Sequence, residues 1–354
     1  MAALPEPKHA TVHKIFDARA RTADDEHRPH LGASIIGRKC ERRLWLTFRW
    51  ARAEKFPGRV LRLFERGQME ESRWWADLRR IGVQVHEFDP AGNQWRIAFA
   101  GGHGGGSMDA AVVGVPEAPK TWHVAEVKTH NAKSFADLEK KGVKASKPEH
   151  WAQMQVYMER TGMDRALYCA TNKDTDDLYT ERVEHDPVEA KRLIARAERI
   201  VNAPEPPLRI SADPSWYECK LCHFAPLCHG NELPGVNCRT CAHSTPVVVD
   251  GADHGLWDCA AHGRQEIPVQ WQRSGCDKHR YIPAFLEKVA QQCDVRGDDV
   301  VYRTPEGQEF VNGTAPGAMT SAEMLSVNDA TRLAFAASCK VELAREGLDP
   351  KVVG

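Results

Sequence analysis

The chain has 354 residues, 42% of them hydrophobic, and a formal net charge of −1 at pH 7. This length exceeds the roughly 250–300 residues at which one hydrophobic core stops growing, so we expect one large domain and a smaller module. The balanced charge excludes a protein coated in basic side chains for binding nucleic acid. No stretch reaches the roughly 18 apolar residues of a membrane span, and residues 1–21 lack the apolar segment of a secretory signal. These features predict a cytoplasmic protein, of a bacterium or a phage-infected cell, with no membrane partner.

Two helices and a basic segment are predicted in the first 81 residues. Ser34 is a candidate N-cap for a helix that includes Cys40, and residues 63–81 have the periodicity of a second helix. Residues 38–66 contain ten Lys or Arg and three acids, a local charge of +7. Such a run is either a solvated face or a patch that binds phosphate groups.

From Gly82 onward the sequence changes to strand-like periodicity, with Gly, Pro and Asn between the segments. The predicted strands are QVHEF, QWRIAFAG, SMDAAVVG and WHVAEVKTH and, after a helix over 148–160, RALYCATN and DLYTERVEH. An amphipathic helix over 186–202 and the proline-rich piece NAPEPPLRISADP end this unit. The alternation predicts an α/β fold with a central mixed sheet flanked by helices. Farther on, we expect a hairpin over 296–313 and a terminal helix over 329–346.

Three ionisable residues on two neighbouring predicted strands are candidates for catalysis. Asp109 lies in one strand, and Glu126 and Lys128 lie two residues apart in the next, so their side chains share a face of the sheet. Two carboxylates that converge at a sheet edge can hold a hard divalent ion, and a neighbouring lysine can orient or help to deprotonate an attacking water. This chemistry hydrolyses phosphodiesters. The alternative is that Glu126 and Lys128 form an exposed ion pair.

In their order along the chain, these residues resemble the PD-(D/E)xK nuclease superfamily over about residues 30–230. The resemblance is to its RecB-like branch with an iron-sulfur cluster, which includes Cas4 proteins and phage recombination exonucleases. The matching motifs are Gly67 with Glu71, Asp109, Glu126 with Lys128, and Gln153 with Tyr157 on one helical face.

The resemblance implies a restriction-endonuclease-like core and a role for each catalytic residue. Glu71, Asp109 and Glu126 would bind Mg²⁺ or Mn²⁺, and Lys128 would position or activate water. Gln153 and Tyr157 would steady the site or the DNA. Glu70 and Gln155 would take the roles of the neighbouring motif residues if their helices present a different face to the site than the one predicted.

The resemblance also implies an iron-sulfur site. In this branch one cysteine precedes the nuclease motifs and three follow them, and here Cys40 precedes them while Cys219, Cys222 and Cys228 follow at C-x2-C-x5-C spacing. The four thiolates would carry a 4Fe-4S cluster with a structural role. The alternative is a buried Cys40 and a zinc site formed by the triplet with His223 or His229.

A second set of cysteines runs Cys238-x2-Cys241-x17-Cys259-x16-Cys276. The first pair is a typical metal knuckle, and we expect the four to bind Zn²⁺, with His243, His262 and His279 as substitutes. The alternative is a set of unligated cytosolic thiols.

We therefore expect residues 1–230 to form the nuclease domain, 231–285 a cysteine-rich zinc module, and 286–354 a hairpin and helix of unknown role. The function expected is a metal-dependent DNA exonuclease acting on DNA ends or single strands, in recombination, repair or phage DNA processing. The basic segment would line the DNA path, with Trp45 and Trp50 stacking on bases. The alternatives are a catalytically weak DNA clamp or a Cas4-like accessory subunit with a recombination, replication or adaptation partner protein.

Overall fold

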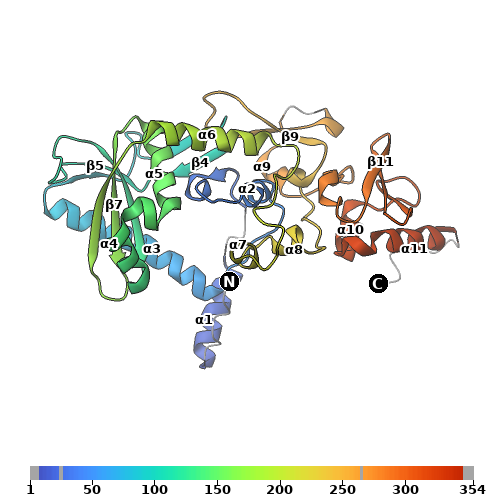
Figure 1. Cartoon of the computed structure of the whole chain (residues 1–354), viewed down its shortest axis with the longest axis horizontal. Coiled ribbons are helices and arrows are strands. Elements are labelled where there is room, and N and C mark those ends of the chain that lie inside the picture. Colours follow the sequence, from blue (N-terminus) through green and yellow to red (C-terminus); the bar gives the residue numbers. More distant parts are fainter. Residues whose placement is uncertain (1–7, 24–26, 264–265, 346–354) are drawn as a thin grey trace.

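The computed structural model describes residues 8–23, 27–263 and 266–345. A five-stranded mixed sheet lies toward the left end of the molecule in Figure 1, with strand order β2-β5-β6-β7-β8 and only the β6–β7 pair parallel. The strands are β2 (Gln84–His86), β5 (Ala110–Val113), β6 (His123–His130), β7 (Arg165–Asn172) and β8 (Leu178–Glu184).

Helices cover both faces of this sheet, so the predicted α/β fold with a helix-flanked mixed sheet is confirmed. On one face, α3 (Gly58–Arg80) packs Trp74, Trp75 and Leu78 against the strands. On the other, the largest core cluster includes side chains of α4 (Ala132–Ser146), α5 (Pro148–Thr161) and α6 (Pro187–Asn202).

Local signals explain where α5 and α6 begin and end. Pro148 lies in the first turn of α5, where a backbone N–H has no hydrogen-bond partner within the helix, so the N–H that proline lacks is not missed. Gly162 ends the helix at a φ of 71°. Asp186 caps α6 by accepting a hydrogen bond from the Glu189 amide at 3.1 Å. The predictions for α3, α5 and α6 are confirmed, whereas α4, which Gly142 interrupts at a φ of 71°, was not predicted.

The helix predicted to begin at Ser34 begins later. Residues Ala33–Ile35 form a single 3-10 turn (η1), and α2 (Glu41–Phe48) starts after Cys40, which is its N-cap. Gly37 explains the interruption, because a Cβ atom there would lie 2.8 Å from the Cβ of Ala152 in α5. This close approach fixes the segment before α2 against α5, and the prediction of one continuous helix was wrong.

A smaller sheet of order β1-β4-β3 lies beside the large one. It consists of β1 (Leu31–Gly32), β3 (Arg96–Phe99) and β4 (Gly104–Ser107), and β3 and β4 form a hairpin. The glycines of β4 are required by packing: a Cβ at Gly104 would lie 2.3 Å from the Phe99 ring, and one at Gly106 would lie 2.5 Å from the Tyr157 hydroxyl. This hairpin leads directly to Asp109.

The cysteine-rich segment packs against the main core. Its hairpin consists of β9 (Ser244–Val247) and β10 (Leu256–Cys259), and Trp257 and Ile267 belong to the largest core cluster.

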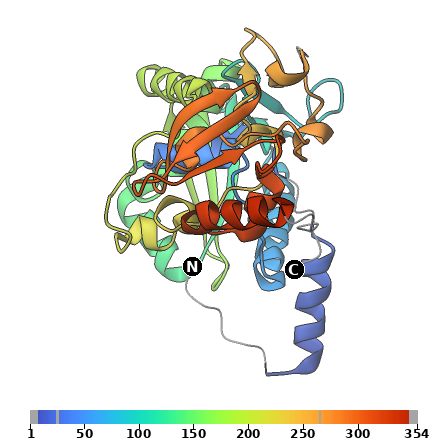
Figure 2. The ribbon, with the colours of Figure 1, turned by 90° about the vertical axis from the view of Figure 1, so that its right-hand side faces the viewer.

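A second core cluster fills the C-terminal part. There the antiparallel sheet β11 (Gln291–Arg296), β12 (Asp299–Arg303) and β13 (Glu309–Asn312) lies beside α10 (Ser321–Val327) and α11 (Leu333–Arg345), as Figure 2 shows. The predicted hairpin and terminal helix are confirmed.

The remaining elements are short, apart from α1 (Ala10–Arg21), which contacts α3. They are α7 (Tyr217–Lys220), α8 (Ala225–Cys228), η2 (Cys238–Thr240), η3 (Ala260–His262), α9 (Val269–Gln272), η4 (Pro283–Phe285) and η5 (Ala330–Arg332). Among the described residues, no helix has the length and apolar character needed to cross a membrane.

Candidate active site

Two adjacent strands bring Asp109, Glu126 and Lys128 together. Ala110 lies opposite Ala125 in the antiparallel β5–β6 pair, so Asp109, which precedes β5, reaches the middle of β6. Its Oδ2 accepts a hydrogen bond from the Val127 amide at 2.9 Å. As the period-two pattern predicted, Val127 points toward α3, and Glu126 and Lys128 share the opposite face.

Glu126 is the most constrained group of the site. Its side chain has no exposure to solvent, and one oxygen, Oε1, forms an ion pair with the Lys128 ammonium. The other oxygen, Oε2, is buried and has no hydrogen-bond partner. A buried carboxylate oxygen without a partner is costly, so this atom is a candidate metal ligand. The exposed ion pair considered as an alternative is excluded, since Glu126 is buried.

Glu71, and not Glu70, faces these residues. Glu70 is buried in a separate network, in which its Oε1 accepts from the Thr171 hydroxyl at 2.9 Å and its Oε2 pairs with Arg73 at 3.0 Å. Glu71 is half-buried, and the charges of Asp109 and Lys128 act on it. The motif assignment therefore selects the residue that the structure also orients toward the site.

Gln153 and Tyr157 form one hydrogen-bonded unit on α5. Gln153 donates to the Tyr157 hydroxyl at 3.1 Å, and that hydroxyl donates to the carbonyl of Ser107 at 3.0 Å. The Gln153 Oε1 is buried without a partner. Gln155 instead binds the backbone at Glu184 and Asp186. Tyr157 thus links α5 to the strand end before Asp109.

Burial raises the pKa values of the acids. Burial, then repulsion by Asp109, raises the pKa of Glu71 to about 7. Burial likewise raises the pKa of Asp109 and, with repulsion from Asp109, that of Glu126. Burial alone would lower the pKa of Lys128, but the surrounding carboxylates outweigh it and hold the pKa above its ordinary value. The three acids therefore hold their protons more tightly than exposed carboxyl groups do, whereas Lys128 keeps its charge.

The donor set fits a hard divalent cation. Glu71, Asp109 and Glu126 offer carboxylate oxygens, the ligands that Mg²⁺ and Mn²⁺ prefer, and the unpartnered Glu126 Oε2 is among them. Over the described ranges, no group of three or more His, Cys, Asp or Glu side chains stands already arranged to hold a metal ion. The Lys128 ammonium and the Val127 amide occupy one oxygen each of Glu126 and Asp109, which leaves the second oxygen of each carboxylate for a metal ion.

Sequence reasoning missed a buried cluster beside Lys128. The Tyr168 hydroxyl lies 2.9 Å from His130 Nε2 and 2.8 Å from His150 Nδ1. Burial lowers the pKa of His130 to about 4 and that of His150 to about 3, so both imidazoles are neutral at pH 7. The signal was present: His130 follows Lys128 by two residues on one strand, and His150 precedes Gln153 by three on one helix.

The early and late cysteines converge on one pocket. Cys40 caps α2, and Cys219, Cys222 and Cys228 lie in and around α7 and α8; all four line the same cavity. His229 also lines it. The His223 ring instead contacts Arg52 through Nδ1 at 3.1 Å. Cys238, Cys241, Cys259 and Cys276 line a second, separate cavity.

The basic segment is divided between the interior and the surface. Arg49 is buried, and Arg42 donates to the Pro207 carbonyl at 2.7 Å, so these residues are structural. Trp45 and Trp50 are 0% and 2% exposed, and the prediction that they stack on bases was wrong, because both pack in the interior.

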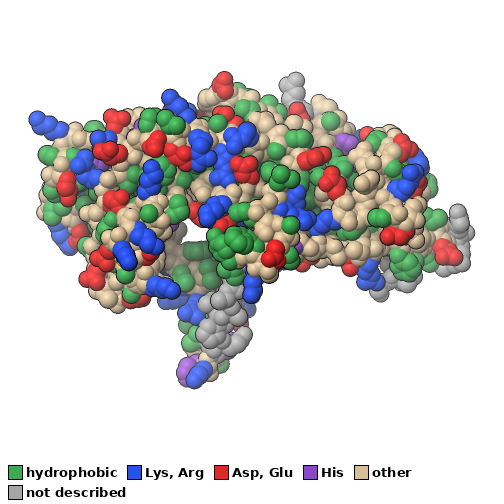
Figure 3. All heavy atoms as spheres, viewed as in Figure 1, with side chains coloured by type: hydrophobic (Ala, Val, Ile, Leu, Met, Phe, Trp, Pro, Cys, Tyr) green, Lys and Arg blue, Asp and Glu red, His purple; other side chains and the backbone are tan. Residues whose placement is uncertain are grey.

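The exposed part of the basic segment includes Arg59, Arg62 and Arg66 on α3, the helix that carries Glu71. On the face drawn in Figure 3, basic and acidic side chains are interspersed, and a hollow opens between the lobe of α4 and the lobe of α7.

Comparisons with known proteins gave only distant structural likenesses. No family model and no curated protein matches the sequence. The fold is similar to an alkaline exonuclease from Laribacter hongkongensis, at 19% identity and a TM-score of 0.37, over 53% of this chain and 90% of that chain. A second structure of that exonuclease, in complex with dAMP, gives 17% identity and a TM-score of 0.35 over the same shares. The protein SSO0001 gives 14% identity and a TM-score of 0.37, over 62% of this chain and 97% of that one.

Proposed function

We propose that this protein is an Mg²⁺- or Mn²⁺-dependent deoxyribonuclease, an exonuclease that acts on DNA ends or single strands in recombination, repair or phage DNA processing. One observation carries the proposal: Glu126 is fully buried beside Asp109 and Lys128 and keeps an oxygen without a partner. A purely structural role would leave that oxygen's desolvation uncompensated. The order of the motifs supplies the reaction class.

Glu71, Asp109 and Glu126 would hold the metal ion, which when bound supplies Lewis acidity at the scissile phosphate. Lys128 remains protonated beside the acids, so its Nζ can donate hydrogen bonds to the attacking water or to a phosphate oxygen but cannot take up a proton. Its role is therefore orientation and charge stabilisation rather than general-base catalysis. Gln153, held by Tyr157, directs its unpartnered Oε1 into the same buried region.

Digestion of end-labelled single- and double-stranded DNA with Mg²⁺ or Mn²⁺ tests the proposal. We expect metal-dependent cleavage that Glu126→Ala and Lys128→Ala each reduce by about 10²–10³-fold or more, the scale for losing one electrostatic contact to a transition state. Glu117→Ala and Lys133→Ala are matched controls, because both residues are exposed. These controls should cleave at the native rate.

Two other outcomes would replace the proposal. DNA binding without cleavage by the native protein would identify a clamp. Weak cleavage that rises when a recombination, replication or adaptation protein copurifies would identify an accessory subunit of a larger complex.

We also propose that Cys40, Cys219, Cys222 and Cys228 hold a 4Fe-4S cluster with a structural role. Their shared pocket supports the proposal, and Arg42, Arg43 and Arg209 line the same pocket and would balance the charge of four thiolates. The His223 ring does not line this pocket, which disfavours the alternative that it joins a zinc site there.

A further inference from the structure

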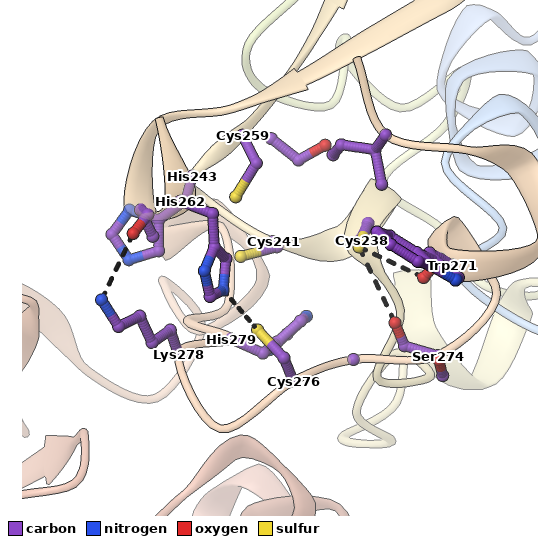
Figure 4. Close-up of a pocket in the computed structure, with 14 residues that line it drawn as sticks. Cys238, Cys241, His243, Cys259, His262, Trp271, Ser274, Cys276, Lys278 and His279 are labelled. Atoms are coloured by element: carbon purple, nitrogen blue, oxygen red, sulfur yellow. Dashed lines mark hydrogen bonds between the residues drawn. The ribbon is translucent and has the colours of Figure 1, made fainter. Parts of the chain in front are cut away.

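The second cysteine cavity lies about the hairpin β9–β10 and has a volume of about 300 Å³. Its lining includes Cys238, Cys241, Cys259 and Cys276 and the histidines His243, His262 and His279. Figure 4 shows the sulfurs of Cys241, Cys259 and Cys276 directed to one space, with the His262 ring beside them and Cys238 across from them, near Trp271.

Short, hydrogen-bonded turns fix the positions of these cysteines. Cys238 begins η2, and the Cys241 amide closes the knuckle by donating to the Cys238 carbonyl at 3.1 Å. Cys259 ends β10, and the His279 amide donates to the Cys276 carbonyl at 2.8 Å. The chain therefore presents the four sulfurs from ordered backbone, as metal knuckles do.

Donors already point at two of the sulfurs. The Arg280 amide donates to the Cys241 Sγ at 3.5 Å, and His262 Nε2 lies 3.4 Å from the Cys276 Sγ. These contacts hold the Cys241 and Cys276 sulfurs in place, as groups outside the ligand set do at metal sites.

Buried positive charge lies next to this cavity. Arg239, inside the knuckle, is 0% exposed, and its guanidinium lies 3.7 Å from the centre of the Trp50 ring and 4.8 Å from that of Trp257. Its guanidinium donates to the carbonyls of Phe48 and Pro29 and to the Gln272 Oε1 at 3.1, 2.8 and 3.0 Å, respectively.

A second buried guanidinium lies close by. Arg49 is 3% exposed and donates to the carbonyls of Arg239 and Ala203. Within the described part of the chain, neither Arg49 nor Arg239 has a carboxylate partner. Two buried cations without anions are unfavourable unless negative charge lies near.

We infer that Cys238, Cys241, Cys259 and Cys276 bind one Zn²⁺ ion. Four thiolates and one Zn²⁺ carry a net charge of −2, which would offset cationic groups near the cavity: Arg239 next to Cys238, and Lys278 in the lining. To join the site, the Cys238 sulfur turns from the carbonyl oxygens of Trp271 and Ser274, 3.5 and 3.7 Å away, into the cavity. His262 supports Cys276 from outside the ligand set.

The ion would cross-link turns of the cysteine-rich segment, which packs against the hairpin that leads to Asp109. His103, in the glycine-rich turn between β3 and β4, contacts the carbonyl of Val247 in β9 through Nε2 at 3.0 Å. A Cβ on Gly102 would lie 2.4 Å from the backbone of His254, so turn and hairpin are in close contact. This role is structural and independent of the proposed nuclease chemistry.

Metal analysis of the full-length protein tests the site without any activity assay. We expect one zinc per chain in the native protein and in Cys293→Ser, whose cysteine is exposed and outside both cavities. Cys238→Ser and Cys259→Ser should each lose the zinc. His262→Ala should retain it, because His262 lies outside the ligand set.

Cobalt exchange keeps the test informative if a cysteine variant fails to fold. Co²⁺ added to the native protein should give the absorption of a tetrahedral four-thiolate site. No zinc in the native protein, or iron in its place at this site, overturns the proposal. Loss of zinc in His262→Ala with retention in Cys238→Ser overturns the four-cysteine ligand set.

Discussion

Glu70 and Glu71 are neighbours in α3, yet they have different surroundings. Successive residues on an α-helix point about 100° apart, so one glutamate contacts Thr171 and Arg73 while the other faces Asp109. In the sequence, the spacing from Gly67 selects Glu71. The structure gives the physical reason, since only Glu71 adds its charge to the acidic site.

This placement predicts a pH dependence of stability. The pKa of Glu71 is about 7 in the folded protein and near its ordinary value of 4.5 when unfolded. Between these values the folded state binds the proton and the unfolded state does not, so metal-free protein should lose stability as pH rises from 4.5 through 7. Mg²⁺ or Mn²⁺ should restore stability at pH 7 and above and have little effect near pH 4.5. Thermal unfolding across this range measures both effects.

Glu71→Gln removes this titration and should reduce the slope of the pH profile of the metal-free protein between pH 4.5 and 7, while Asp109 and Glu126 keep their contributions. Glu117→Gln, at an exposed turn, should leave the profile of the native protein unchanged. An unaltered slope in Glu71→Gln would show that Glu71 does not titrate in the site.

At the scale of elements, packing explains why several glycines precede Asp109 in the hairpin β3–β4. Strand β4 passes so close to Phe99 and Tyr157 that side chains would not fit at Gly104 or Gly106. The need for each glycine arises from contacts with α5 and β3. Such contacts between distant segments are not visible in the sequence.

Two glycine substitutions should therefore have opposite effects. Gly106→Ala places a Cβ 2.5 Å from the Tyr157 hydroxyl and 3.2 Å from the Ala33 Cβ, and should lower the free energy of unfolding by about 1–3 kcal/mol. Gly67→Ala lies within α3 with no atom within 4 Å of the added Cβ, and should raise it by about 0.5–1 kcal/mol. Urea unfolding measures both, and equal effects would contradict the packing argument.

At the scale of the whole molecule, the two cysteine sets join segments at different distances along the chain. Cys40 and the late triplet connect the start of α2 to the segment around α7 and α8. The second set connects turns within the cysteine-rich segment, whose Trp257 packs in the largest core cluster. Metal centres at these positions would restrict the unfolded chain more than the folded one.

The proposed iron-sulfur clip therefore has a measurable effect on stability. Closing a loop of about 180 residues contributes up to about 5 kcal/mol in the chain-entropy treatment of cross-links. Cys222→Ser should abolish bound iron and sulfide in protein purified without oxygen and should lower the unfolding midpoint. Cys293→Ser is the control with an exposed cysteine and should change neither. Zinc in place of iron, held by Cys219, Cys222 and Cys228, would contradict the cluster.

The sequence by itself determined the features that follow from periodicity and spacing. The alternation of strands and helices predicted the mixed sheet with α3, α5 and α6, and period two placed Glu126 and Lys128 on one face. These features depend on local backbone geometry, which each short segment carries in its own residues.

Only the tertiary structure decided the features that depend on contacts between distant segments. Trp45 and Trp50, which were predicted to stack on bases, are buried. The helix α2 begins later than predicted, and Gly37 before it lies in close contact with Ala152. The tertiary structure also left the Glu126 Oε2 without a partner and placed Arg239 next to Cys238. Burial and charge balance are sums over neighbours that the chain brings together only on folding, so no local pattern could have predicted them.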